Sequence, residues 1–154
     1  MMKMYQKSLP HYISKILVDI LFYASIVCTL MVPVFSRQVY MWIQYPYESY
    51  FLPFTLIVFV SGIFCVLILY HLKRLFKTLM VGDPFVEGNV VHLRRIALYC
   101  GCISLIYAVK CLFLFTLLTF VVAGAFCVGC LLCLTLKDLF KQAVNYKAEN
   151  ELTI

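Results

Sequence analysis

Long uncharged stretches, bounded by charged residues, make up most of the sequence. A helix of about 20 apolar residues, rising 1.5 Å per residue, crosses the roughly 30 Å hydrocarbon core of a bilayer. The stretch between Lys15 and Arg37 has Asp19 as its only charge, and the stretch from Ser49 to Tyr70 has none. Each of the two therefore predicts one membrane-spanning helix.

A third apolar stretch, from Ile96 to Leu136, is too long for a single span. As one helix it would measure about 60 Å, twice the hydrocarbon thickness. Its only charge is Lys110, and we expect the chain to reverse between Lys110 and Phe115, with the ammonium group reaching the outer surface. A later reversal would place Lys137 and Asp138 close to mid-membrane, at a high energetic cost.

The pattern as a whole predicts an all-α membrane protein, a bundle of four transmembrane helices in one domain. The spans cover about residues 16–36, 50–71, 91–110 and 116–137. An amphipathic helix start at about residues 84–95 precedes the third span, because Phe85, Asn89, Leu93 and Ile96 recur on one face at steps of three and four residues. The fourth helix is expected to continue as a cytoplasmic extension over residues 138–154.

The content and distribution of charged residues exclude a soluble domain and a nucleic-acid-binding protein, and they predict the orientation of the chain in the membrane. Charged residues are 13% of the chain, against about 25% in soluble domains, and hydrophobic residues are 64%. The net charge of +6 does not indicate nucleic-acid binding, because the basic residues form no tract with interleaved aromatics. All of them except Arg37 and Lys110 fall on the side that carries both termini. The positive-inside rule therefore predicts both ends in the cytoplasm and a multi-pass protein of the cytoplasmic membrane.

The eight cysteines are the first candidates for chemistry. No cysteine lies between Ser36 and Leu52, the predicted outer connection, so a disulfide framework is not expected. The spacing Cys127-x-x-Cys130-x-x-Cys133 resembles a redox or metal motif, but no histidine lies nearby to complete a zinc site. We favour helix packing through small residues, with Ala125-x-x-x-Gly129 as the close-approach pair.

Asp19 is the candidate intramembrane acid, since a carboxylate in lipid is costly and often functional. The alternative is that it pairs at the inner interface with Lys15 or with a basic residue of a neighbouring helix. His11, His71 and His92 are interpreted as separate residues of that interface. With no HExxH, phosphate-binding loop, nucleophile elbow or paired acids, the sequence predicts no enzyme, no cofactor and no metal.

Two segments resemble a known family. One is GDPFVEGN at residues 82–89 running into LRRI at 93–96, and the other runs from Phe140 to the terminal ENELTI at 149–154. They are similar to the bacterial four-span membrane proteins called domain of unknown function 2975 (DUF2975). That family usually has Asp where this chain has Glu151, and often Gly where it has Ala143.

The resemblance implies a regulatory role, because the family has no established activity and its genes often lie beside a gene for a short helix-turn-helix regulator. We therefore expect a bacterial membrane protein that docks such a regulator, contacts membrane lipids and does not bind nucleic acid directly; a homo-oligomer is compatible with this. The docking residues would be Asp83, Phe85, Asn89, Arg94, Arg95, Glu149, Asn150 and Glu151. Two alternatives stay open: a small transporter or immunity-type protein acting through Asp19, and a thiol oxidoreductase using Cys127 and Cys130.

Overall fold

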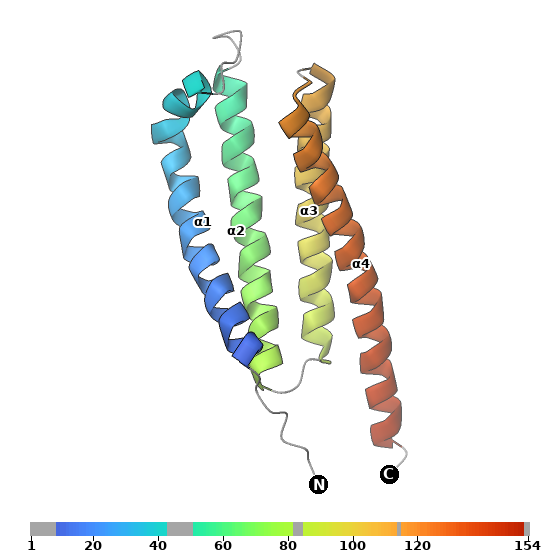
Figure 1. Cartoon of the computed structure of the whole chain (residues 1–154). Helices are drawn as coiled ribbons and strands as arrows, with labels where there is room; N and C mark the ends of the chain where they lie inside the picture. The colour runs from blue at the N-terminus through green and yellow to red at the C-terminus, as the bar shows by residue number, and fades with distance from the viewer. Residues whose placement is uncertain (1–8, 43–50, 82–84, 114, 153–154) are drawn as a thin grey trace.

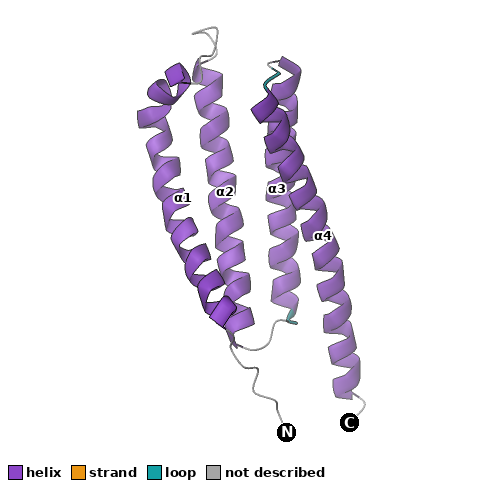
Figure 2. Ribbon diagram, in the orientation of Figure 1, coloured by secondary structure: helices purple, strands orange, loops and turns teal. Residues whose placement is uncertain are grey.

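Four helices make up nearly all of the described chain, and the predicted all-α membrane fold is confirmed. The computed structural model describes residues 9–42, 51–81, 85–113 and 115–152, in which no strand occurs (Figure 2). The helices are α1 (Leu9–Trp42), α2 (Phe51–Val81), α3 (Glu87–Phe113) and α4 (Leu117–Leu152). Each is long and apolar enough to cross a membrane.

The helices pack in chain order. Helix α1 lies on α2, α2 on α3, and α3 on α4, and the α3–α4 contact is the most extensive. Among the described residues α1 and α4 are not neighbours, so two helical hairpins stand side by side and meet only along α2 and α3 (Figure 1). The start of α1, the end of α2, the start of α3 and the end of α4 share one end of the bundle, which we call the basic end.

The helices extend beyond the expected spans. Helix α4 has 36 residues, which at 1.5 Å per residue is about 54 Å and far exceeds the hydrocarbon core. It continues past Asp138 to Leu152. The reversal between the last two helices lies between Phe113 and Leu117, which overlaps the stretch where the sequence places it.

Most large apolar side chains face outward, as lipid permits. Leu30 is 67% exposed, Val34 71% and Leu112 84%, whereas the buried apolar residues lie mainly along one face of α3. Lipid tails are as apolar as leucine, so these helices are held together by close packing and by polar contacts rather than by the burial of apolar surface.

Small residues let α3 and α4 approach each other. A Cβ added at Gly101 would lie 3.5 Å from Cys130 Sγ, and one added at Gly129 would lie 3.9 Å from Cys100 Sγ. The Ser104 hydroxyl donates a hydrogen bond to the Ala123 carbonyl at 2.9 Å.

The packing interpretation of the cysteine segment is therefore only partly correct. Gly129 and Cys130 pack against α3, but Ala125 and Cys127 are exposed, so Ala125 is the wrong partner for Gly129 in a close-approach pair. The small residues of α4 that contact α3 in the described structure include Ala123, Gly129 and Cys130, and Ala125 is not among them.

Candidate functional site

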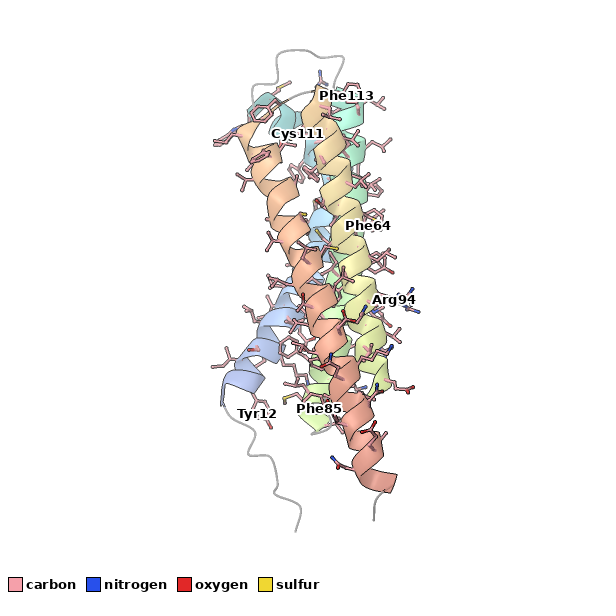
Figure 3. The ribbon with its side chains drawn as sticks, turned by 90° about the vertical axis from the view of Figure 1, so that its right-hand side faces the viewer. Tyr12, Phe64, Phe85, Arg94, Cys111 and Phe113 are labelled. Atoms are coloured by element: carbon pink, nitrogen blue, oxygen red, sulfur yellow. The ribbon has the colours of Figure 1, made fainter. Side chains whose placement is uncertain are left out.

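The two segments that resemble the family meet at the basic end. The Phe85 ring lies 5.6 Å from the Phe140 ring, centroid to centroid, which joins the start of α3 to α4. Phe85 remains 43% exposed, and its position beside α4 is visible in Figure 3. Segments more than 50 residues apart in sequence are thereby brought into contact.

Asn89 lies beneath this contact and is fully buried, at 0% exposure. The Thr78 hydroxyl, near the end of α2, donates to the side-chain Oδ1 of Asn89 at 2.8 Å, and the backbone N–H of Asn89 donates to the Val86 carbonyl at 3.0 Å. A buried side-chain amide costs free energy unless it is hydrogen-bonded, so the bond from Thr78 helps to fix how α2 packs on α3. Asn89 thus lies inside the bundle, where a docked partner could not touch it.

The remaining residues at the amphipathic start of α3 are buried or exposed as their spacing in the sequence predicts. Leu93 and Ile96 are buried, at 5% and 4% exposure, whereas Glu87, Arg94 and Arg95 are exposed. Arg94 projects away from the bundle, on a different side of α3 from Phe85 (Figure 3). The buried face continues through Ala97, Cys100 and Ile103, which the sequence pattern did not single out because that stretch is apolar on every side.

The end of α4 supplies the other expected docking residues. Glu149 and Asn150 are both exposed on α4. Asp83 and the side chain of Glu151 lie outside the described residues. We define the docking surface as four exposed or half-exposed residues at the start of α3 and along the end of α4, of which the structure brings the first two into contact: Phe85, Phe140, Glu149 and Asn150.

Two histidines meet at the junction of the hairpins. The Nδ1 atoms of His71 on α2 and His92 on α3 lie 3.0 Å apart, within hydrogen-bond distance. His71 is only 3% exposed, and its ring stacks on Tyr99 at 5.8 Å between centroids. One ring must donate and the other accept, so at least one histidine of the pair is neutral. The sequence did not predict this contact between the two histidines, because sequence spacing does not show which residues of α2 and α3 face each other.

Arginines flank this histidine pair from both helices. Arg74 donates from Nη2 and Nε to the Tyr70 hydroxyl, at 3.0 and 3.3 Å. Arg95 lies one helical turn from both His92 and Tyr99 on α3, and both guanidinium groups are close enough to the histidines to act on them electrostatically. We name the group the histidine–arginine cluster: Tyr70, His71, Arg74, His92, Arg95 and Tyr99.

The Asp19 carboxylate forms an ion pair with a lysine of the neighbouring helix α2. Its Oδ1 lies 3.0 Å from Lys73 Nζ on α2, and both side chains are about one-third exposed, at 31% and 36%. The Lys73 ammonium also lies over the rings of Phe22 and Tyr23, at 5.2 and 4.8 Å from their centroids. The geometry is that of a partly exposed ion pair at the basic end, which ties α1 to α2.

Neutralising this carboxylate with Asp19→Asn is expected to lower the free energy of unfolding by only about 1 kcal/mol, because exposed ion pairs contribute little. The measurement is unfolding of the purified protein by SDS in mixed micelles, with Lys15→Gln as a control at the same end of α1. A loss of several kcal/mol, or an unchanged stability with loss of an ion flux, would instead mark Asp19 as a functional acid.

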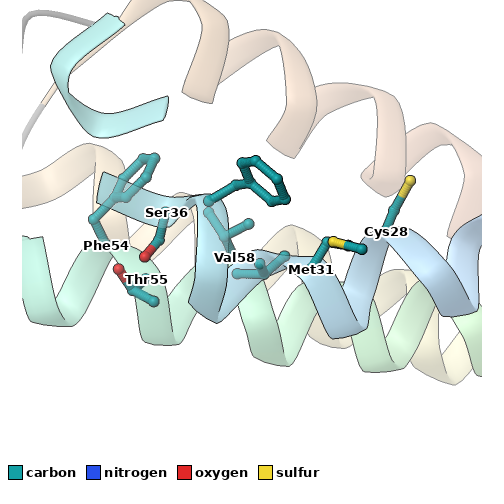
Figure 4. Close-up of a pocket in the computed structure, with 8 residues that line it drawn as sticks. Cys28, Met31, Ser36, Phe54, Thr55 and Val58 are labelled. Carbon is teal, nitrogen blue, oxygen red and sulfur yellow. The ribbon is translucent and has the colours of Figure 1, made fainter. Parts of the chain in front are cut away.

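Cavities in the described structure are apolar. One of about 210 Å³ lies between α1 and α2 toward the end opposite the basic end, with Cys28, Phe54 and Val58 among its lining residues (Figure 4). Another of about 230 Å³ lies along the same two helices and is lined by residues such as Ile26 and Leu67. Neither is lined by Asp19, which argues against an ion pathway through them. The described residues include no group of three or more His, Cys, Asp or Glu placed to hold a metal ion.

Comparison with known proteins returns one match. The family model described as Protein of unknown function (DUF2975) matches residues 39–154, which include the whole of α2, α3 and α4. No curated protein and no solved structure matches the chain.

Proposed function

Because the chain belongs to the DUF2975 family of proteins of unknown function, we propose that it is a non-enzymatic regulatory protein that docks a small cytoplasmic helix-turn-helix regulator at its basic end. The protein resides in the bacterial cytoplasmic membrane with both termini inside. A docked regulator is held at the bilayer and away from DNA.

The observation that carries this proposal is the contact between Phe85 and Phe140. It joins the two segments by which the chain resembles its family, and it leaves an aromatic surface exposed outside the spans. Exposed aromatic residues are typical anchors of protein interfaces, since they bury much area at a low cost in side-chain entropy. The buried amide of Asn89 supports the same surface from below.

Charge supplies a reason for the sequestration. Proteins that bind DNA present arginine and lysine side chains to the phosphate backbone. Glu149 and its neighbour Asn150, exposed near the end of α4, offer a carboxylate and an amide to those same basic groups. A regulator held in this way could not engage DNA with the same surface, so docking and DNA binding exclude each other.

The cytoplasmic placement rests on the distribution of charge. The basic end carries the described lysines and arginines except Arg37 and Lys110. Positive residues in short connections are retained on the cytoplasmic side during insertion. Labelling of intact cells should therefore fail to reach a tag after Ile154, and labelling from outside would exclude docking of any cytoplasmic partner.

The direct test measures binding of the regulator encoded beside the gene to the protein in lipid nanodiscs. The double substitution Glu149→Gln/Asn150→Ala should weaken binding at least about tenfold, or about 1.4 kcal/mol, as expected when central interface contacts are removed. Both positions are exposed on α4, so the fold should be unaffected.

Asn145→Ala is the matched control, because it removes the same kind of exposed amide one helical turn before Glu149, outside the residues assigned to the docking surface. It should leave the affinity unchanged, and expression of the regulator's target genes should respond only to the double substitution. Equal binding by the wild-type and doubly substituted proteins, or no binding by either, would overturn the docking proposal.

A further inference from the structure

The histidine–arginine cluster carries positive charge that no acid in the described structure balances. The ion pairs there join Lys73 to Asp19 and Lys137 to Asp138, and neither involves Arg74 or Arg95. The other four members are neutral tyrosines and a histidine pair that contributes no negative charge. Two exposed guanidinium groups on facing helices therefore lack an anion.

The positions of Arg74 and Arg95 along their helices, relative to the thickness of the bilayer, indicate which anion the two guanidinium groups meet. From Phe51 to Tyr70, α2 rises about 30 Å, the thickness of the hydrocarbon core, so Arg74 lies one turn beyond it. From Phe113 back to Arg95, α3 rises a similar distance of about 27 Å. Both guanidinium groups are thus placed at the level of the lipid phosphates in the leaflet at the basic end.

The side chains around Arg74 prepare it for a phosphate group. Two of its nitrogens, Nε and Nη2, donate to the Tyr70 hydroxyl, which orients the planar guanidinium. A guanidinium held in this way keeps further N–H groups for a phosphate oxygen and loses less entropy on binding than a free side chain. The ring of His71 on α2 stacks on the ring of Tyr99 on α3. This contact holds the two helices that carry Arg74 and Arg95 at a fixed distance from each other.

We infer that the histidine–arginine cluster is a binding site for the phosphate of an anionic membrane phospholipid, held between Arg74 on α2 and Arg95 on α3. This ligand is independent of the proposed regulator, which docks at Phe85, Phe140, Glu149 and Asn150. It lies between α2 and α3, the two helices along which the described hairpins touch.

The test is native mass spectrometry of the full chain released from nanodiscs that contain equal amounts of phosphatidylglycerol and phosphatidylcholine. The wild-type protein should retain phosphatidylglycerol preferentially. Arg74→Gln/Arg95→Gln should lower the ratio of retained phosphatidylglycerol to phosphatidylcholine by about tenfold. The control Lys77→Gln/Lys141→Gln removes two exposed charges from the same end and should keep the wild-type ratio.

Two outcomes would overturn this inference. An equal loss of preference in the cluster variant and the control would show that general surface charge, and not a site, retains the lipid. Displacement of phosphatidylglycerol by millimolar inorganic phosphate would show that the cluster takes a soluble anion instead. A circular-dichroism spectrum of the cluster variant equal to that of the wild type separates loss of the site from loss of the fold.

Discussion

His71→Ala should lower the free energy of unfolding by about 2–4 kcal/mol, the largest effect expected of any single substitution described here. His71 is 3% exposed, stacks on Tyr99 and shares a hydrogen bond with His92. Its removal leaves a cavity and an unpaired ring nitrogen between α2 and α3. Because the described hairpins touch only along these helices, we expect the loss to loosen one hairpin against the other.

The measurement is the unfolding midpoint of the purified protein in SDS, compared between His71→Ala and the wild type. The control Leu98→Ala truncates a side chain that is 59% exposed to lipid and should cost little.

His92→Ala should act through the same contact as His71→Ala. The double variant should therefore cost clearly less than the two single losses added together. Additive losses would show that the two rings do not depend on each other.

The sequence predicts the spans well because they depend on a one-dimensional pattern. Length and hydropathy decide where a helix can cross the bilayer, and the cost of burying Lys137 and Asp138 decides where the chain reverses. The buried face at the start of α3 could also be predicted, since Asn89, Leu93 and Ile96 recur at steps of four and three residues and are all buried.

Contacts between helices could not be predicted in the same way, because they depend on how each helix is rotated about its axis. In water an apolar stripe reveals that rotation, but in lipid both the protein interior and the surroundings are apolar. Ala125 and Gly129 look equally suited to packing, yet only Gly129 faces α3. The pairing of His71 with His92 is missed for the same reason, although their positions at facing helix ends are a usable signal.

Three polar contacts between helices lie at the basic end. The Asp19–Lys73 ion pair, the histidine pair and the Thr78–Asn89 hydrogen bond join α1 to α2 and α2 to α3 there. At the opposite end, Lys110 donates to the Thr119 hydroxyl at 3.3 Å and lies over the Phe54 ring, which joins α3 to α4 and α3 to α2. Polar contacts therefore join the described helices at both ends of the bundle, and the three at the basic end lie where we propose that the regulator and the phospholipid bind.

Gly62→Ala should destabilise the protein by about 1–3 kcal/mol by forcing α1 away from α2. An added Cβ would lie 2.8 Å from Thr29 Oγ1 and 3.0 Å from Thr29 Cγ2, too close for either atom. Thr29 cannot turn away easily, because it is β-branched within a helix and its hydroxyl donates to the Ser25 carbonyl at 2.7 Å. The overlap should outweigh the gain of about 1 kcal/mol that alanine brings to a helix interior.

Gly124→Ala is the matched control, since a Cβ there would meet nothing within 4 Å and only the gain in helix propensity remains. Its unfolding midpoint in SDS should equal or exceed that of the wild type, whereas Gly62→Ala should fall below it. Adding Thr29→Ala removes both crowded atoms, so the double variant should recover most of the loss. Because recovery needs the two side chains to face each other, a double variant no more stable than Gly62→Ala would mean that α1 and α2 meet in a different register.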